Sequence, residues 1–133
     1  MEIIKIKRKK EVDIMKNLQS NYLRRGDIVF MDLPKNENSS VQYGLRPCVI
    51  ISNQKAINSS PVLNILPITS KNKRCNDLHV KVSKECGLKL DSIVLTEQIL
   101  TVSKHLIKNK IGKVPENKMK EINRIVINQL SLA

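Results

Sequence analysis

From Arg25 onward the chain alternates short apolar runs with polar turns, and this alternation limits the fold more than any other feature of the sequence. The apolar runs cover residues 26–33, 47–52, 62–69, 78–82 and 92–100. Their length and their β-branched residues are typical of strands, and the segments between them contain turn-forming Asn, Ser, Pro and Gly. Those segments are too short for the crossover helices that join parallel strands. The sequence therefore predicts a mainly β fold with mostly antiparallel strands.

The C-terminal segment has a helical pattern instead. Pro115 and Glu116 mark a helix start, and the apolar residues after them recur at the helical spacing of three or four. These residues are Met119, Ile122, Ile125, Val126 and Leu130. We expect an amphipathic helix of about four turns that packs against the sheet.

The length of 133 residues allows one hydrophobic core but not two ordinary domains. We expect one domain over residues 21–133, preceded by a basic extension, residues 1–20. The extension contains Lys5, Lys7, Arg8, Lys9, Lys10 and Lys16. Two interpretations of it stay open: a solvated tail, or an accessory arm that binds phosphates.

Membrane and secreted proteins are disfavoured. The apolar runs are shorter than the roughly 18 to 20 residues that cross a bilayer, and no apolar stretch follows the N-terminal charges as in a signal peptide. Cys48, Cys75 and Cys86 are odd in number and widely spaced, which favours reduced thiols. We therefore expect a cytoplasmic protein that is not bound to a membrane.

A metal site is also disfavoured. It would require Cys75, His79 and Cys86 to converge, whereas the alternation in residues 78–82 indicates a strand that does not direct Cys75 and His79 to one point. We expect no metal and no cofactor.

The net charge of +12 favours a polyanionic partner, with nucleic acid first among the candidates. A soluble basic protein rich in Lys, Ile and Asn is the open alternative. Phe30, Tyr22 and Tyr43 are the only aromatic residues, so a stacking platform for bases is poorly supplied. Contacts with RNA would depend on charge and hydrogen bonds.

One loop places a cation at the edge of the predicted sheet. Residues 42–51 form a glycine-containing loop that leads through Arg46 into a buried strand. Pro47 keeps Arg46 out of the helical region and opens the strand. The Arg46 guanidinium can bind two phosphate oxygens at once.

Four ordered segments resemble the conserved blocks of the MazF/PemK toxin family. They are residues 25–29, 44–53, 66–70 and 91–102, and the similarity extends over roughly residues 22–132. The resemblance implies a small SH3-like antiparallel barrel of the MazF/CcdB type. It also implies a homodimer that cleaves single-stranded RNA at a short preferred sequence and is neutralised by an acidic antitoxin.

The resemblance further implies that Arg46 and Thr69 are the catalytic residues. RNA carries its own nucleophile, the 2′-hydroxyl, so an enzyme can work without a metal if it aligns this group and stabilises the phosphorane. Arg46 would stabilise the negative charge, and it could also protonate the leaving oxygen. The Thr69 hydroxyl would donate to a phosphate oxygen or orient the 2′-hydroxyl.

The segment before Arg46 departs from the family pattern. Val41 stands where many members have an acidic residue, which removes a candidate general base. His79 and His105 are the only histidines, and we expect both to be surface residues or residues with satisfied hydrogen bonds. The general base stays unassigned.

Polar residues near the two catalytic positions are candidates for binding RNA. They are Gln42, Ser70, Lys71, Lys73, Arg74, Glu97 and Gln98. The cations would contact phosphates, while Glu97 and Gln98, taken to close a strand, could contact base edges or serve structural roles.

Two other functions remain open. A CcdB-like toxin would share the barrel but would poison a topoisomerase, which implies a C-terminal aromatic residue, usually Trp. This chain contains no Trp and ends at Ser131-Leu132-Ala133. The second alternative is a nucleic-acid-binding module without catalytic activity, with Val41 as the mark of the lost activity.

Overall fold

The computed structural model describes residues 23–132, apart from residues 36, 38 and 72–74. The elements in chain order are β1 (Asp27–Leu33), β2 (Gly44–Ile50), α2 (Gln54–Ser59), β3 (Val62–Thr69), β4 (His79–Val82), the 3-10 turn η1 (Lys84–Cys86), β5 (Ser92–Leu95), β6 (Leu100–Ser103), the 3-10 turn η2 (Lys104–Leu106), β7 (Ile107–Lys113) and α3 (Glu116–Gln129). The predicted N-terminal extension lies outside the described residues.

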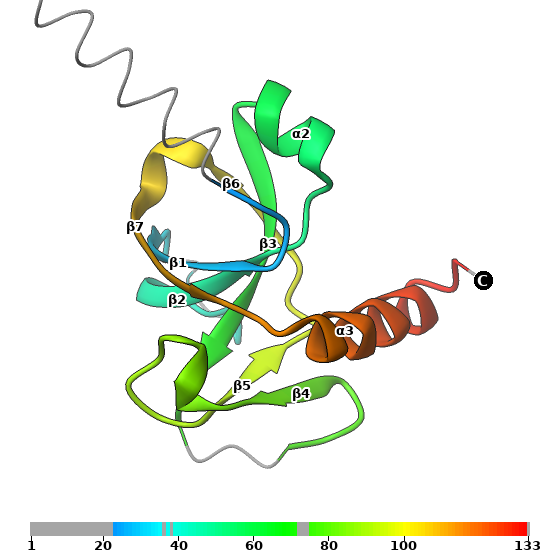
Figure 1. Ribbon diagram of the computed structural model, residues 1–133. Coiled ribbons are helices and arrows are strands. Elements are labelled where there is room, and N and C mark those ends of the chain that lie inside the picture. The colour runs from blue at the N-terminus through cyan, green and yellow to red at the C-terminus, as the bar shows by residue number, and fades with distance from the viewer. Residues whose placement is uncertain (1–22, 36, 38, 72–74, 133) are drawn as a thin grey trace, which may run out of the picture.

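The strands form one strongly curved antiparallel sheet (Figure 1). The strand order is β4-β5-β3-β2-β1-β7, and β6 pairs with β3 beside this path. β3 is the central element because its first part pairs with β6 and β2, whereas its last residues pair with β5. The predicted mainly β, mostly antiparallel fold is confirmed.

The predicted strands differ from the observed ones in several places. The run 92–100 is not one strand, because a turn closed by the Gln98 N–H and the Leu95 carbonyl separates β5 from β6. β2 begins at Gly44, so Pro47 lies inside the strand and does not open it. Neither α2 nor β7 was predicted. β7 pairs only with β1 and has three exposed residues in its middle, so it lacks the apolar pattern of a buried strand.

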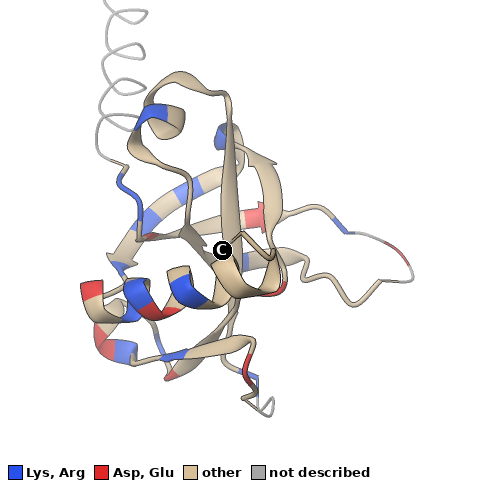
Figure 2. Cartoon of the chain, turned by 90° about the vertical axis from the view of Figure 1, so that its right-hand side faces the viewer, with Lys and Arg blue, Asp and Glu red and all other residues tan. Residues whose placement is uncertain are grey.

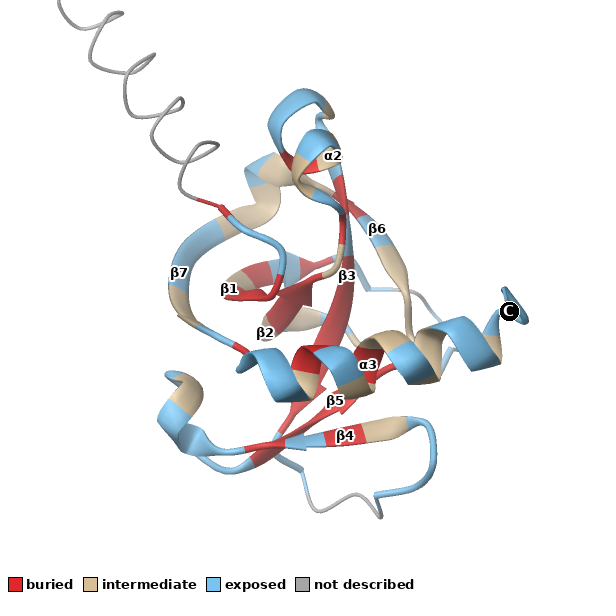
Figure 3. Ribbon diagram, turned by 45° about the vertical axis from the view of Figure 1, so that its right-hand side comes forward, coloured by how far each residue is buried: buried red, intermediate tan, exposed pale blue. Residues whose placement is uncertain are grey.

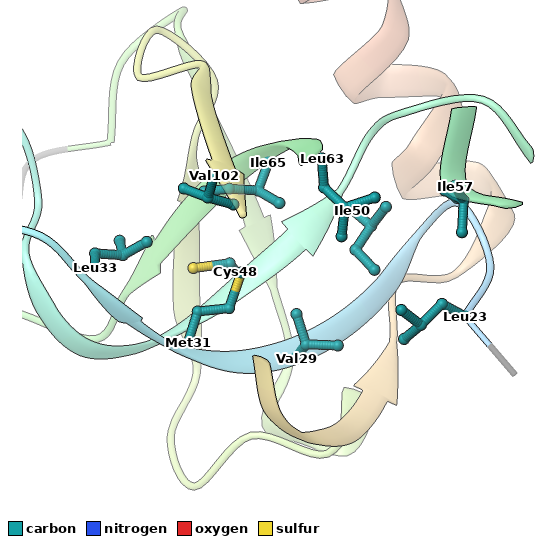
Figure 4. Close-up of a cluster of buried hydrophobic side chains, with 10 residues drawn as sticks. All are labelled: Leu23, Val29, Met31, Leu33, Cys48, Ile50, Ile57, Leu63, Ile65 and Val102. Atoms are coloured by element: carbon teal, nitrogen blue, oxygen red, sulfur yellow. The ribbon is translucent and has the colours of Figure 1, made fainter. Parts of the chain in front are cut away.

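Alternate residues of the central strands belong to two different hydrophobic clusters. Val29, Cys48 and Ile65 belong to the first cluster, which lies between β1, β2, β3, β6 and α2 (Figure 4). The residues adjacent to these on the same strands point to the opposite side of the sheet. Ile28 and Val49, which are next to Val29 and Cys48, belong to the second cluster. The two sides of the curved sheet are therefore both covered.

α3 covers the second cluster. It begins directly after Pro115 and runs for 14 residues, in agreement with the predicted amphipathic helix of about four turns. Met119 and Ile122 are buried, while the opposite side of the helix is exposed (Figure 3). Within the part of the chain that the structure describes, no helix is long and apolar enough to cross a bilayer.

Candidate active site

Arg46 lies near the start of β2, opposite Met31 of β1. Its Nε donates a hydrogen bond of 2.7 Å to the carbonyl oxygen of Tyr43. Gly44 makes this return contact possible, because its φ of 80° is a left-handed conformation that glycine adopts without a steric penalty. The contact uses Nε and leaves the two Nη groups without a partner among the described residues.

The β2–β3 ladder ends between two prolines. Its last pair is Cys48↔Pro67. The next position on β2 in this direction is Pro47, which has no N–H to donate. Beyond this pair the end of β3 is paired with β5, on its other side, and no longer with β2; Thr69 lies opposite Ile93. The two strands therefore separate here, and each contributes two further residues to the opening.

Arg46 and Thr69 lie at corresponding positions in this opening. Residues opposite one another in antiparallel strands project from the same side of the sheet, as do residues i and i+2. Continuing the register of Cys48↔Pro67 by two residues would place Arg46 opposite Thr69. The two residues therefore project from the same side of neighbouring strands, where the strands are no longer paired.

Thr69 is held firmly at the end of β3. The residue is 2% exposed, and its Oγ1 accepts a 3.3 Å hydrogen bond from the N–H of Lys71. A hydroxyl that accepts one hydrogen bond still has its own proton to donate. The Thr69 hydroxyl is thus fixed in place and retains a donor.

Thr69 lines an open cleft of about 610 Å³. Lys71, Lys81 and Lys118 line it, against one carboxylate, that of Asp91. The remaining lining residues are Ser70, Cys75, Val82, Ser83, Ser92 and Ile93. Figure 2 shows basic positions both on strands and on α3, where acidic positions alternate with them. The cleft is basic and rich in hydroxyl groups, but Arg46 does not line it.

The two predicted RNA-binding glutamines contact each other. Gln98 Oε1 accepts from the Gln42 N–H at 2.9 Å, and Gln98 Nε2 donates to the Ser40 carbonyl at 3.2 Å. The structure thus brings Gln42 and Gln98 together beside the loop that leads to Arg46. Gln98 does not close a strand, as the sequence suggested, but lies in the turn between β5 and β6.

Glu97, in the same turn, is engaged with a histidine. Its Oε1 lies 3.1 Å from Nε2 of His79, whose side chain is only 7% exposed. The Asn76 N–H donates to Nδ1 of His79 at 3.4 Å. His105 also has a partner, because its Nδ1 lies 2.6 Å from Oγ of Ser103. Both histidines therefore have a hydrogen-bond partner, and His105 is also exposed, in line with the expectation of surface residues or residues with satisfied hydrogen bonds.

Of the predicted phosphate-binding residues after Thr69, Ser70 and Lys71 are exposed and line the cleft. Lys73 and Arg74 lie outside the described residues. Sequence reasoning missed Lys81, Lys118, Ser83 and Ser92 as residues of the cleft. Lys81 alternates with the buried Val80 and Val82, but nothing in the sequence showed that β4 and α3 face the same space as Thr69.

The three cysteines are free thiols. Burial raises the pKa of Cys48 to about 12, while the charge of Arg46 acts in the opposite direction. Burial also raises the pKa of Cys86. Over the described residues, no three His, Cys, Asp or Glu side chains group closely enough to hold a metal ion.

The chain resembles known proteins over most of its length. A family model described as PemK-like, MazF-like toxin of type II toxin-antitoxin system matches residues 24–130. An endoribonuclease MazF from Staphylococcus saprophyticus is 38% identical over 112 residues, which are 83% of this chain and 92% of that protein.

Solved structures share the fold at lower identity. An endoribonuclease from a mycobacterial species, in complex with its cognate antitoxin, has a TM-score of 0.69 at 22% identity and covers 84% of this chain and 97% of its own. MazF from Deinococcus radiodurans has a TM-score of 0.72 at 15% identity, with 82% and 96% covered. The match to the family model and the 38% identity confirm the resemblance inferred from the four sequence blocks. The chain therefore belongs to the PemK-like, MazF-like toxins of type II toxin-antitoxin systems.

Proposed function

We propose that this chain is an endoribonuclease toxin that cleaves single-stranded RNA through attack by the 2′-hydroxyl on the adjacent phosphate. The main support is that a half-buried arginine and a buried threonine project from the same side of two neighbouring strands, beyond the last pair of their ladder. The name of the 38% identical relative points to the same activity.

The reaction needs no water and no external reactant. The 2′-oxygen forms a bond to phosphorus while the bond from phosphorus to the 5′-oxygen breaks. Overall, the proton of the 2′-hydroxyl replaces the lost bond on the 5′-oxygen. The products are a 2′,3′-cyclic phosphate and a 5′-hydroxyl end.

Arg46 is the electrostatic group in this proposal. The phosphorane carries more negative charge on its equatorial oxygens than the ground state, so a cation fixed beforehand stabilises it selectively. The bond from Nε to the Tyr43 carbonyl fixes the plane of the guanidinium, and the two Nη groups can then donate to two oxygens. Arginine stays protonated at neutral pH, which makes this role more secure than proton donation to the 5′-oxygen.

Thr69 is the neutral donor. Its hydroxyl can donate to a phosphate oxygen or to the 2′-oxygen because its acceptor side already binds the Lys71 N–H. The general base stays unassigned: Val41 cannot serve, and Glu97 is engaged with His79.

The cleft beside Thr69 suits the RNA strand that flanks the cut. Lys71, Lys81 and Lys118 would bind phosphates, and Ser70 would add a hydrogen bond. Lys73 and Arg74, which follow Lys71 in the sequence, stay candidates for the same role. Gln42 is half-buried in the loop that leads to Arg46, and it stays a candidate for contact with a base.

The proposed partners are a second copy of the chain and an acidic antitoxin. Ile127, Leu130 and Leu132 are exposed at the end of α3, which projects beyond the strands in Figure 1, and a second copy could cover them. The net charge of +12 favours a negatively charged inhibitory segment. Two structural neighbours, from a mycobacterial species and from Deinococcus radiodurans, were solved in complex with antitoxins.

A cleavage assay tests the proposed reaction. A mixed pool of single-stranded RNA is incubated with the protein in EDTA, and the ends of the fragments are determined. We expect discrete fragments with 2′,3′-cyclic phosphate and 5′-hydroxyl ends. The strand is then resynthesised with a 2′-deoxy sugar at the mapped cut, and this strand should resist. Cleavage of the deoxy strand at the normal rate, or a strict need for a divalent metal, would contradict the mechanism.

A further inference from the structure

The carboxamide of Gln98 bridges two backbone groups of the β1–β2 loop. Its oxygen accepts the Gln42 N–H at 2.9 Å, and its nitrogen donates to the Ser40 carbonyl at 3.2 Å. Gln98 is more than fifty positions away from this loop in the sequence. The side chain is thus a long-range clamp on this loop.

Gln98 itself is well anchored. Its N–H donates to the Leu95 carbonyl at 3.0 Å, which closes the turn after β5. The neighbouring Thr96 is fully buried, and both its N–H and its hydroxyl donate to the Leu78 carbonyl. The side chain of Gln98 can therefore hold the loop in place, because the backbone around Gln98 is hydrogen-bonded to the rest of the protein.

The clamped segment leads directly to Arg46. Gln42 is followed by Tyr43, whose carbonyl accepts the hydrogen bond from Arg46 Nε, and Gly44 turns the chain between them. The ring of Tyr43 also lies under Lys35 Nζ, 5.5 Å from the ring centre, at the other end of the loop. The position of the Tyr43 carbonyl, and through it the plane of the guanidinium, therefore depends on the segment that Gln98 holds.

We propose that Gln98 is a positioning residue of this enzyme, which clamps the β1–β2 loop so that the Tyr43 carbonyl orients the Arg46 guanidinium for the phosphate. This inference rests on the proposed function, because it assigns Gln98 a role in the same site. It differs from the expectation that Gln98 reads a base: both ends of its carboxamide already bind the loop, so a base could be read only after the clamp opens.

The test uses Gln98→Met, which keeps the length of the side chain and removes both hydrogen bonds. Gln129→Met is the matched control, because Gln129 donates a single 2.8 Å hydrogen bond to the Thr96 carbonyl and does not touch the loop. We expect kcat to fall about tenfold or more in Gln98→Met, the size expected for losing one or two hydrogen bonds, with little change in KM. The control should stay within about twofold of wild type, because Thr96 retains its bonds to Leu78.

A double-mutant cycle separates positioning from direct contact. In an Arg46→Ala background, Gln98→Met should cause little further loss, because the clamp acts through Arg46. An equal loss in both backgrounds, or a change in the preferred RNA sequence, would show that Gln98 contacts the RNA and would overturn the positioning role.

A second measurement does not depend on cleavage of RNA. Trypsin cuts after Lys35 in the loop but not after Arg46, because Pro47 follows it. We expect the Lys35 site to be cut about tenfold faster in Gln98→Met than in wild type or Gln129→Met, at equal melting temperature. Unchanged proteolysis would refute the clamp, and faster proteolysis with normal kcat would refute its link to Arg46. If the wild type cleaves no RNA at all, the proposed function fails, while the proteolysis still decides whether the clamp exists.

Discussion

Thr69 allows the catalytic role of a hydroxyl to be separated from its structural role. Thr69→Val keeps the shape of the side chain and removes the hydroxyl. Thr69→Ser keeps the hydroxyl and removes the methyl group. Because the residue is 2% exposed, both substitutions act on a buried side chain, and each serves as the control for the other.

The two changes should cost similar stability. Valine loses the acceptor of the 3.3 Å hydrogen bond from Lys71, which is worth about 1 kcal/mol net. Lys71 is an exposed residue, so water can replace this bond. Serine loses one buried methyl group, which is also worth about 1 kcal/mol. A loss of this size lowers the melting temperature of a domain of this length by about 3–6 °C.

The two changes should differ sharply in activity. If the Thr69 hydroxyl donates to the reacting phosphate, Thr69→Val should lower kcat by about 10²–10³, the usual loss for one preorganised donor. Thr69→Ser should stay within about fivefold of wild type. The assay is single-turnover cleavage of a fluorescent RNA, with circular dichroism to establish that both variants are folded. A folded Thr69→Val variant with a normal rate would remove Thr69 from the mechanism.

Four further outcomes follow from the same geometry. Arg46→Ala should lower kcat by about two orders of magnitude or more without unfolding the protein, as checked by circular dichroism, because the residue is half-buried at the end of a ladder. Ile122→Ala should lower the free energy of unfolding by about 2–5 kcal/mol in urea titrations, since it removes a fully buried side chain from the second cluster. At pH 8 iodoacetamide should alkylate the exposed Cys75 but not Cys48, whose pKa of about 12 leaves roughly one thiolate in ten thousand; mass spectrometry would detect either product. Deleting residues 1–20 should flatten the salt dependence of RNA binding if the extension contacts phosphates, and an unchanged slope would identify it as a tail.

Periodicity predicted the elements whose apolar pattern is simple. β3 alternates its contacts between the two clusters and was predicted with its observed bounds, and α3 was predicted from its start signal and its spacing. β7 was missed because an exposed edge strand contains lysines where a buried strand has apolar residues. The apolar run after Asp91 concealed a turn, because the buried Thr96 and the half-buried Ile99 on its two sides continue the pattern of the strands.

The active site could be predicted only in part. Arg46 and Thr69 came from the family resemblance, since a strand-end threonine has no distinctive sequence pattern. The cleft could not be predicted, because it joins β4, β5 and α3 through tertiary packing. The clamp on the loop could not be predicted either, since nothing in the sequence links Gln98 to Ser40, which is 58 positions away.

The backbone explains why the β2–β3 ladder stops before Arg46 and Thr69. A continuous β2–β3 ladder would pair the backbones of Arg46 and Thr69 and fill the space that a phosphate needs. Pro47 has no N–H for such a ladder, and the last two residues of β3 pair with β5 but not with β2. The side chains of Arg46 and Thr69 still project from the same side of the sheet. The strands are no longer paired there, which leaves room for a substrate. β3 lies between β5 and β2 in the sheet, so the pairing of Ile68 and Thr69 with Val94 and Ile93 does not occupy the edge that faces β2. The opening therefore depends on the end of the β2–β3 ladder at Cys48↔Pro67, where Pro47 supplies no N–H for a further pair.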